Sequence, residues 1–244
     1  MKTVRFFYDI ACPYAYLAST QIEAICRAAD AELEWCPILL GGLYRSVGGK
    51  DHPANSWPAS KVLHNEKDMQ RQAECYGVPL KRPDCYPQRT VDAQRMLLAA
   101  PAKLRAKLTH RLYRAYWVEG LPIGSREVLK HIAEEVGVDT AFLEDPRIKQ
   151  ALFDATKEAQ DLGMFGVPST QVGDTFYWGA DRLQFVARDL GLERIVHEDS
   201  PAPSPAPKIE FFHDFSSPFS YLAATQIERI TNCLLYTSPS PRDA

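Results

Sequence analysis

The sequence contains no hydrophobic run long enough to cross a membrane and no recognisable export signal. A membrane-spanning helix needs about 18 consecutive apolar residues, and the 244 residues contain no such run. The first residues, Met1 to Arg5, lead directly into a strand-like run instead of the apolar core of a signal peptide. We therefore expect a soluble, cytoplasmic protein with no membrane partner.

The chain also lacks a strong charge of either sign. Its formal net charge is −3, with 24% charged residues. A protein that binds nucleic acid or an anionic membrane surface usually carries a clear excess of Lys and Arg. The charge therefore gives no reason to expect a nucleic-acid partner.

Six cysteines are present, but none belongs to a Cys-x-x-Cys pair or to a metal-ligand spacing. In a reducing cytosol these cysteines are expected to be free thiols. This excludes a local dithiol centre and predicts no metal. Cys26 and Cys36 lie in apolar patterns typical of a core. The six positions are 12, 26, 36, 75, 85 and 233.

The periodicity of apolar residues predicts strands at both ends of a long helical stretch. The expected strands are Val4–Tyr8, Glu32–Leu40, Ser169–Val172 and Thr175–Trp178, with Gly41-Gly42 ending the second. The expected helices are Pro13–Ala28, Glu66–Tyr76, Thr90–Ala100, Leu104–Glu119, Arg126–Val136, Asp145–Leu162 and Asp181–Asp189.

This order, β-α-β, a helical block, then α-β-β-α, predicts an α/β protein with a thioredoxin-like fold and an inserted all-helical domain. A block of several helices between two matching halves fits a doubly wound sheet poorly. We assign residues 1–196 to the thioredoxin-like domain, with the helical insertion at about 43–150. The proline-rich segment 197–208 is then an extended linker.

After the linker, the chain repeats its own beginning. Residues 209–230 match residues 4–25 at a fixed offset of 205 without a gap, and 12 of the 22 positions are identical. Cys12 of the first copy is replaced by Ser217 in the second, while the following proline is retained. We interpret residues 209–230 as the truncated start of a second thioredoxin-like domain, produced by tandem duplication.

Residues 231–244 break the helical pattern that the first copy continues at the equivalent place. Their sequence resembles a translated sequencing adapter, so we interpret them as a non-native tail. A strand and one helix cannot bury a core alone. We therefore expect residues 209–244 to be loosely held.

Cys12 is the first candidate for chemistry, because it stands at the predicted start of a helix and is followed by Pro13. The unpaired backbone N–H groups of a helix N-terminus favour a thiolate over a thiol. The alternative is an inert cysteine in the core. Since residue 15 is Ala, Cys12 has no resolving partner in a Cys-x-x-Cys arrangement.

Two further motifs lie near the predicted C-terminal strands. Pro168 stands at the start of a strand, where thioredoxin-like folds often have a cis proline that leaves the backbone of Val167 free to pair with a peptide-like ligand. An ordinary trans proline is the alternative. Asp181 opens the last helix, as a capping or first-turn carboxylate or as a partner for a ligand's ammonium group.

Taken in order, the motifs of this chain resemble the 2-hydroxychromene-2-carboxylate isomerase family, sister to kappa-class glutathione transferases and DsbA-type oxidoreductases. The resemblance covers about residues 3–192. The motifs are Phe-Tyr-Asp-x-x-Cys12-Pro-Tyr-Ala-Tyr-Leu, Pro37-Ile-Leu-Leu-Gly-Gly, Lys61-x-x-His-x-x-x-Asp-x-x-Arg71, Tyr76-Gly-Val-Pro, Tyr116-Trp-Val-Glu, Gly163-Met-Phe-Gly-Val-Pro168 and Phe176-Tyr-Trp-Gly-Ala-Asp-Arg182.

The resemblance implies a glutathione site. Cys12 stands where the family usually has a serine that points at the glutathione sulfur. Val167, followed by Pro168, would offer its backbone to the cysteinyl unit, Lys61 would meet a carboxylate of glutathione, and Asp181 would meet the γ-glutamyl ammonium group. Gly48-Gly49 falls where relatives commonly have Gly-Asn, so one polar contact to the ligand is missing.

We therefore expect a glutathione-dependent isomerase or kappa-type transferase that acts on small aromatic-derived electrophilic carboxylates. Tyr14, Tyr116 and Trp117 are candidates to line the substrate pocket, or they belong to the core. One alternative is a single-cysteine thiol–disulfide oxidoreductase that forms mixed disulfides with glutathione or client proteins. Another is a non-catalytic binding domain. Relatives also suggest a homodimer.

Overall fold

The computed structural model describes residues 1–49, 57–140, 144–192 and 208–235. The chain divides into two compact units, residues 1–196 and residues 197–244. Most of the predicted linker (197–207) and most of the predicted adapter-derived tail (236–244) lie outside the described residues. Each unit is therefore described by itself.

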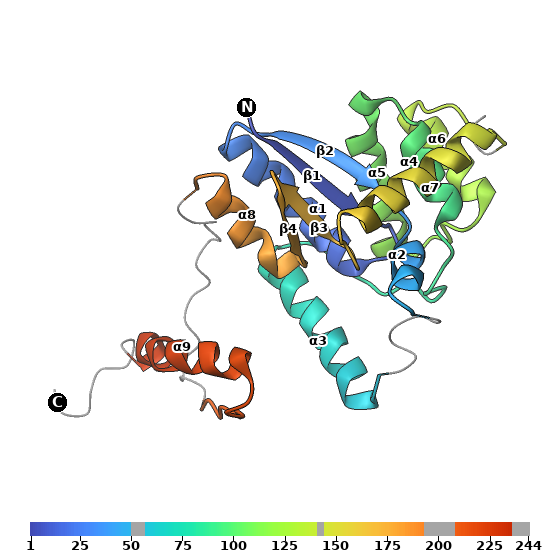
Figure 1. The fold of residues 1–244 in the computed structure, drawn as a ribbon. Helices are drawn as coiled ribbons and strands as arrows, with labels where there is room; N and C mark the ends of the chain where they lie inside the picture. The colour runs from blue at the N-terminus through green and yellow to red at the C-terminus, as the bar shows by residue number, and fades with distance from the viewer. Residues whose placement is uncertain (50–56, 141–143, 193–207, 236–244) are drawn as a thin grey trace, which may run out of the picture. The chain divides into compact units, whose positions relative to one another are not determined.

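The first unit is built on a four-stranded mixed sheet (Figure 1). Its strands are β1 (Thr3–Tyr8), β2 (Glu32–Pro37), β3 (Ser169–Val172) and β4 (Thr175–Trp178), in the order β2-β1-β3-β4. β1 pairs in parallel with β2 and antiparallel with β3, and β3 forms a hairpin with β4. β1, from the beginning of the first unit, therefore pairs with β3, from near the end of that unit. The helices from α1 (Pro13–Ala28) to α7 (Pro146–Asp161) lie between these two strands in the sequence.

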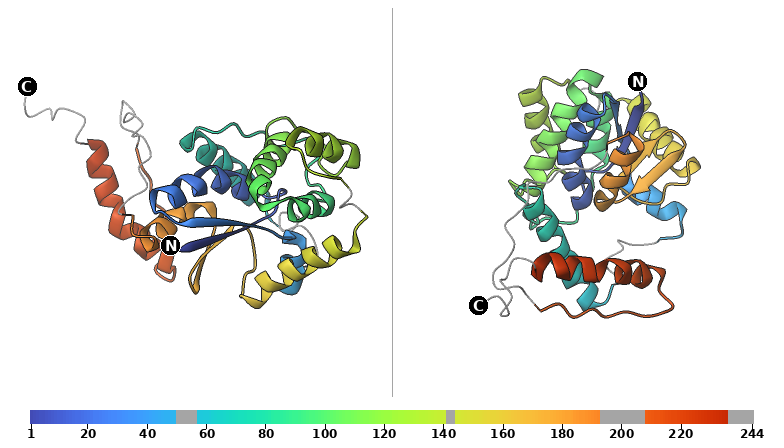
Figure 2. Two further views of the ribbon diagram at one scale, coloured as in Figure 1. Left: turned by 90° about the horizontal axis from the view of Figure 1, so that it is seen from above. Right: turned by 90° about the vertical axis from the view of Figure 1, so that its left-hand side faces the viewer.

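Successive side chains of a strand point to opposite faces of the sheet. In this unit, helices cover both faces. On one face, Tyr177 of β4 stacks on Phe185 of α8 (Leu183–Asp189), with ring centres 6.4 Å apart. On the other face, Arg5 of β1 forms an ion pair with Glu158 of α7 (Pro146–Asp161) at 2.8 Å. Figure 2 shows α1 (Pro13–Ala28) and α7 on opposite sides of the strands.

Between β2 and β3, the chain forms helices that pack mainly on one another and on the ends of β1 and β2 (Figure 1). They are α2 (Leu40–Ser46), α3 (Ala59–Cys75), α4 (Val91–Ala99), α5 (Ala102–Trp117), α6 (Arg126–Val136) and α7. α4 contacts α5, α6 and α7, and α2 contacts α7. Most of them bury one apolar face, whereas α3 buries only Ala73.

Buried hydrogen bonds join these helices to the carboxyl end of the sheet. The Gln94 side-chain amide of α4 donates to the carbonyls of Tyr8 and Ile38, at 2.9 and 2.6 Å. The Tyr8 hydroxyl lies 2.6 Å from the Thr109 hydroxyl of α5. Because all these groups are buried, losing one partner would leave the other unsatisfied away from water. This polar contact orients the helical stretch on the end of β1.

The second strand and the first helices differ from the sequence-based prediction. β2 ends at Pro37 instead of Leu40, because residues 40–46 form the unpredicted helix α2. Gly41 and Gly42 were expected to end the strand but lie inside this helix. A Cβ at Gly42 would lie 2.7 Å from Cγ2 of Thr156, so glycine is needed here for α2 to approach α7. α3 also begins seven residues earlier than predicted.

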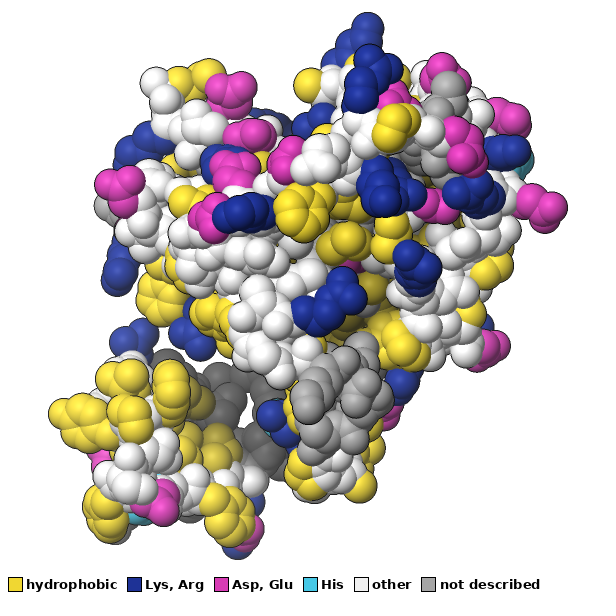
Figure 3. Space-filling model, turned by 45° about the vertical axis from the view of Figure 1, so that its right-hand side comes forward, with side chains coloured by type: hydrophobic (Ala, Val, Ile, Leu, Met, Phe, Trp, Pro, Cys, Tyr) yellow, Lys and Arg dark blue, Asp and Glu magenta, His cyan; other side chains and the backbone are white. Residues whose placement is uncertain are grey.

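The second unit contains one described helix, α9 (Pro218–Leu235), preceded by a segment without regular structure from residue 208. The sequence predicted that the helical pattern breaks from residue 231, but α9 continues to Leu235. Its apolar side chains are widely exposed, and Figure 3 shows yellow apolar side chains over much of this unit's surface. The most exposed are Phe212, Phe215, Phe219, Tyr221 and Leu222. Among the described residues of both units, no helix is long and apolar enough to span a membrane.

Candidate functional site

Cys12 is the N-cap residue of α1, in the turn that follows β1. Its backbone N–H donates to the carbonyl of Asp9 at 3.0 Å, which closes the turn. Its Sγ donates a hydrogen bond to the backbone carbonyl of Val167 at 3.3 Å. The Val167–Pro168 peptide bond is cis. The fold thus brings together two candidate segments that lie 155 residues apart in the chain.

The electrostatic environment of Cys12 differs from the expectation. The residue is only 7% exposed. Burial raises the pKa of its thiol to about 12, and this outweighs the opposing influence of the nearby backbone N–H groups of Ala15 and Tyr14. The expectation that the helix N-terminus would favour the thiolate is therefore wrong for this geometry. At neutral pH, Cys12 is a protonated hydrogen-bond donor.

The loop before Pro168 is held in place by its own hydrogen bonds. The carbonyl of Pro168 accepts the backbone N–H of Gly179 at 2.9 Å, and the Ser169 hydroxyl donates to the carbonyl of Gly166 at 2.8 Å. A Cβ at Gly166 would lie 2.6 Å from Nε1 of Trp178, so a larger residue here would displace the indole. The Val167 carbonyl is therefore presented to Cys12 by a loop that is fixed on both sides.

Asp181 lies in the first turn of the short 3-10 helix η3 (Ala180–Arg182), and Gly179 is its N-cap. The Asp181 carboxylate forms an ion pair with Arg182 at 2.9 Å and is more than half exposed. Burial, a hydrogen bond to Asp68 and nearby negative charges that include Asp181 raise the pKa of Tyr14. The short helix η3 packs against α1, the helix whose N-cap residue is Cys12.

Lys61 is exposed near the start of α3, and its Nζ lies 4.6 Å from the centre of the Trp57 ring. This is a cation–π contact with a residue of the preceding segment. Among the described residues, Lys61 forms no ion pair. Within the described ranges, no contact joins Lys61 to Cys12.

The three predicted pocket aromatics have three different environments. The Tyr14 hydroxyl donates to Asn65 and Asp68 of α3, at 3.2 and 3.0 Å, and so links α1 to α3. Tyr116 is fully buried, which agrees with the core alternative for this residue. Trp117 is 2% exposed, and its Nε1 donates to the carbonyl of Ile10 at 2.8 Å.

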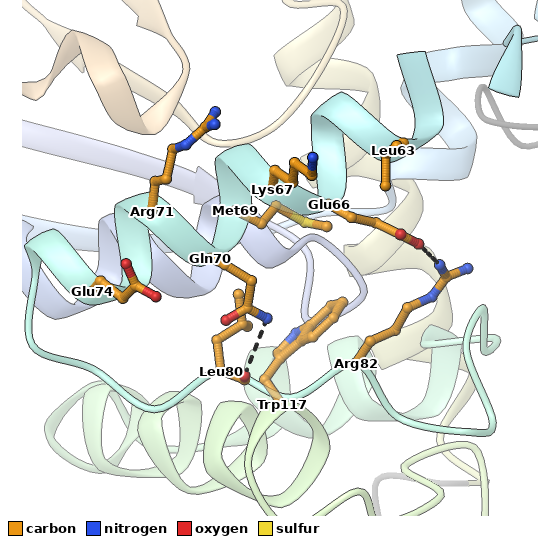
Figure 4. A pocket seen from close by; sticks show the side chains of 10 residues that line it. All are labelled: Leu63, Glu66, Lys67, Met69, Gln70, Arg71, Glu74, Leu80, Arg82 and Trp117. Atoms are coloured by element: carbon orange, nitrogen blue, oxygen red, sulfur yellow. Dashed lines mark hydrogen bonds and ion pairs between the residues drawn. The ribbon is translucent and has the colours of Figure 1, made fainter. Parts of the chain in front are cut away.

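Trp117 nevertheless lines a pocket of about 570 Å³ between α3 and the end of α5. This volume lies in the usual range for small-molecule sites. Figure 4 shows the indole of Trp117 directed toward α3, beside Leu80 and Arg82. We call this space the α3–α5 pocket. It is lined by Leu63, Glu66, Lys67, Met69, Gln70, Arg71, Glu74, Leu80, Arg82 and Trp117.

Asp9 is a site residue to which sequence reasoning gave no role. It is fully buried, and its carboxylate accepts hydrogen bonds from the N–H of Ala11, the N–H of Leu40 and the hydroxyl of Thr90, at 3.0, 2.9 and 2.7 Å. Burial raises the pKa of this carboxyl, and the three hydrogen bonds oppose the shift. Asp9 thus fixes the Cys12 turn to α2 and α4. The repeat retains it as Asp214, which was the available signal.

The DSBA-like thioredoxin domain family matches residues 3–191 of the chain. Among curated proteins, 2-hydroxychromene-2-carboxylate isomerase of Sphingobium xenophagum is 27% identical over 189 residues, covering 76% of this chain and 96% of that protein. Glutathione S-transferase kappa 1 of Homo sapiens is 26% identical over 212 residues, covering 78% and 91%.

Solved structures show the same fold. A 2-hydroxychromene-2-carboxylate isomerase superposes with a TM-score of 0.70 at 23% identity, covering 78% of this chain and 94% of that chain. The cytosolic disulfide reductase DsbM of Pseudomonas aeruginosa, solved with GSH, superposes with a TM-score of 0.53 at 22% identity, covering 77% and 95%. At these identities, the similarity establishes the architecture only.

Proposed function

Because this chain belongs to the DSBA-like thioredoxin domain family, we propose that it is a glutathione-dependent isomerase or transferase. Its relatives include proteins named 2-hydroxychromene-2-carboxylate isomerase and kappa-class glutathione transferase. Its thioredoxin-like α/β fold agrees with both. The proposed substrates are small aromatic-derived electrophilic carboxylates, and glutathione supplies the reacting sulfur.

The contact between the Cys12 thiol and the Val167 carbonyl carries this proposal. A protonated thiol can turn from this carbonyl to a glutathione thiolate and donate a hydrogen bond to it. The backbone of Val167, released from Cys12, can then pair with the cysteinyl unit of glutathione as an added strand does. Asp181 and Lys61, both exposed, would bind the γ-glutamyl ammonium and a carboxylate of the tripeptide.

In this mechanism, the protein orients two reactants and stabilises one anion. The glutathione thiolate adds to an electrophilic carbon conjugated to a carbonyl; a C–S bond forms and the π electrons move to the carbonyl oxygen. The former double bond then rotates. Reversal of the electron flow breaks the C–S bond and releases the isomer with glutathione unchanged. In the transferase reaction, the enolate takes a proton and the thioether remains.

The buried state of Cys12 argues against the single-cysteine oxidoreductase. A nucleophilic cysteine is usually partly exposed and has a lowered pKa, whereas burial raises the pKa of Cys12 to about 12. The thiol therefore suits a hydrogen-bond donor, the role that serine has in the family that the sequence resembles. The oxidoreductase and the non-catalytic binding domain are kept as outcomes of the experiment.

We also propose that the helical stretch between β2 and β3 is an insertion into the thioredoxin-like domain, with bounds of about 43–150. Residues 209–230 are proposed to be the start of a second domain, joined by the linker 197–208 and followed by an adapter-derived tail at 231–244. The 12 identities in 22 aligned positions support this history. Homodimerisation and a cytoplasmic location stay predictions.

The proposed function is tested with Cys12→Ser and Cys12→Ala, with Cys26→Ser as a matched control that is also buried on α1. The assay follows glutathione-dependent isomerisation of 2-hydroxychromene-2-carboxylate by absorbance, and calorimetry measures glutathione binding. Cys12→Ser should retain turnover, because its hydroxyl donates the same hydrogen bond. Cys12→Ala should lower kcat about ten-fold, the usual effect of losing one such donor.

A different pattern would support another function. Loss of all turnover in Cys12→Ser, together with a glutathione mixed disulfide in the intact mass of the unaltered protein, would establish the redox function. Absence of glutathione binding in every variant, with Cys26→Ser and the unaltered protein folded alike, would indicate a non-catalytic domain.

A further inference from the structure

The α3–α5 pocket combines an apolar wall with charged groups. Leu63, Met69, Leu80 and Trp117 supply the apolar side chains. Three cations, two carboxylates and the amide of Gln70 complete the lining, so its ionised side chains sum to one positive charge. Such a combination fits a flat apolar ligand that carries an anionic group.

Arg82 is the cation that faces the apolar wall. Figure 4 shows its guanidinium on the same side of α3 as Trp117 and Leu80, whereas Lys67 and Arg71 extend from the helix away from Trp117. The guanidinium also lies over the Tyr86 ring, 4.9 Å from its centre. Stacking of this kind holds a guanidinium in one orientation while leaving its edge donors available.

Glu66 of α3 occupies one of those donors through an ion pair with Nη1 of Arg82. Both side chains are about half exposed, at 43% and 52%, so the pair is in contact with water and contributes little to stability. A guanidinium has five N–H donors and binds carboxylates in pairs of hydrogen bonds. An incoming carboxylate can therefore compete with Glu66 for Arg82.

The pocket is linked to the Cys12 turn through Trp117. One edge of its indole is bonded to Ile10, two residues before Cys12, and its ring lies 5.6 Å from that of Tyr86. The backbone N–H of Lys81 donates to the carbonyl of Trp117 at 2.7 Å, which fixes the segment that carries Arg82. A ligand on the apolar wall is thus separated from the Cys12 turn by a single aromatic ring.

We propose that the α3–α5 pocket is a separate binding site for an aromatic carboxylate, with Arg82 holding the carboxylate and Glu66 acting as its internal competitor. Because Trp117 stands between this pocket and the Cys12 turn, the site is additional to the proposed glutathione site. The aromatic body lies against Leu63, Leu80 and the edge of Trp117. The carboxylate displaces Glu66 from the outer edge of the guanidinium.

The test measures binding of trans-cinnamate and of its neutral amide to the full chain by calorimetry at neutral pH and low salt. Arg82→Gln should weaken cinnamate binding about ten-fold, since it removes a charged hydrogen bond, and leave the amide unchanged. Glu66→Gln should tighten cinnamate binding several-fold, because the competing carboxylate is gone. Lys81→Gln removes a neighbouring positive charge outside the pocket and serves as the matched control.

Three results would overturn the assignment: equal weakening by Arg82→Gln and Lys81→Gln, equal weakening of the acid and the amide, or weaker cinnamate binding in Glu66→Gln. Glutathione binding, measured separately in each variant, should not change. If glutathione fails to bind the unaltered protein while cinnamate binding still depends on Arg82, the proposed function fails and the pocket assignment stands as a site for aromatic acids alone.

Discussion

Residues 4–25 and 209–230 are identical at 12 of 22 positions, but the apolar residues of the first segment are buried and most of those of the second are exposed. Phe7, Ile10 and Leu17 are fully buried, at 0–1% exposure. Their counterparts at the same offset, Phe212, Phe215 and Leu222, are 59–98% exposed. Nearly the same sequence thus forms the centre of one unit and the surface of the other. Burial is decided by the elements that surround the segment.

The turn before each helix is the same in both segments, which shows how much is encoded locally. Asp9 accepts the N–H of Cys12 at 3.0 Å, and Asp214 accepts the N–H of Ser217 at 3.1 Å. The first helical hydrogen bond, from Tyr16 or Tyr221, is 3.1 Å in both. Helix and turn therefore form in either setting. The strand forms only in the first segment, where β2 and β3 flank it.

The largest expected contrast is in thiol reactivity, because the two helix starts differ in exposure to water. With a pKa of about 12, Cys12 should be alkylated about a thousand-fold more slowly at neutral pH than an exposed thiol of ordinary pKa near 8.5. Ser217→Cys places a thiol at the equivalent, partly exposed position. Iodoacetamide labelling with peptide mass mapping measures both rates in one chain, and exposed Cys75 is the internal reference. Equal rates at 12 and 217 would contradict the comparison.

Truncation of the shared leucine should affect stability in one segment only. Leu17→Ala should lower the free energy of unfolding by about 3 kcal/mol, through lost burial and a residual cavity. Leu222→Ala, on the exposed copy, should change it by less than about 0.5 kcal/mol. Denaturant titration followed by fluorescence gives both values. A loss above about 1 kcal/mol in Leu222→Ala would mean that the second segment is packed against something in solution.

The pKa values of the two equivalent aspartates, Asp9 and Asp214, should be shifted in opposite directions. Burial raises the pKa of Asp9 above its ordinary value, whereas hydrogen bonds from the Ser216 side chain and backbone lower the pKa of Asp214. Carboxyl carbon-13 NMR should therefore place the two midpoints on either side of about 3.9. Asp9→Asn and Asp214→Asn assign the two resonances. Two midpoints on the same side would refute the burial difference.

The raised pKa of Asp9 makes the stability of the fold depend on pH in a definite direction. A carboxyl whose folded pKa is raised favours folding most below its unfolded pKa, and this contribution is lost as pH rises through the folded pKa. Between these values, the unaltered protein should lose stability with rising pH, and Asp9→Asn should flatten that slope. For Asp214 the sign is reversed, since its contribution is present above the unfolded pKa and is lost in acid.

Local signals explain which elements could be predicted from the sequence. The strands β1, β3 and β4 and the helices α1 and α4–α7 were predicted from periodicity and turn residues within one or two positions of their bounds. The missed helix α2 depends on a distant group, because the Asp9 carboxylate accepts the N–H of Leu40 at its first residue. No pattern around Gly41 encodes that contact.

The site was predictable to the same extent. Cys12, Val167 and Pro168 could be paired because each has a local motif. The protonation state of Cys12 and the core position of Tyr116 depend on burial by helices far along the chain. Arg82 and Glu66 meet only because the chain after α3 runs back along that helix, so their pairing has no signature in spacing.

The smallest expected effect concerns the helix cap, where the two copies differ chemically. The Ser217 hydroxyl accepts the N–H of Ser220 at 3.2 Å and caps α9, whereas the Cys12 thiol makes no cap and donates to Val167 instead. Ser217→Ala should therefore destabilise the first turn of α9 by about 1 kcal/mol, the usual value for a serine cap. The measurement is amide hydrogen exchange at Ser220 in the full chain, which should become roughly five-fold faster, the factor that corresponds to about 1 kcal/mol.

Cys12→Ala is the control, and it should leave amide exchange in the first turn of α1 unchanged, because the Cys12 thiol makes no cap. Equal acceleration at both helices would show that Cys12 and Ser217 both act as caps. It would contradict the assignment of Ser217 as a cap and of Cys12 as a donor to Val167.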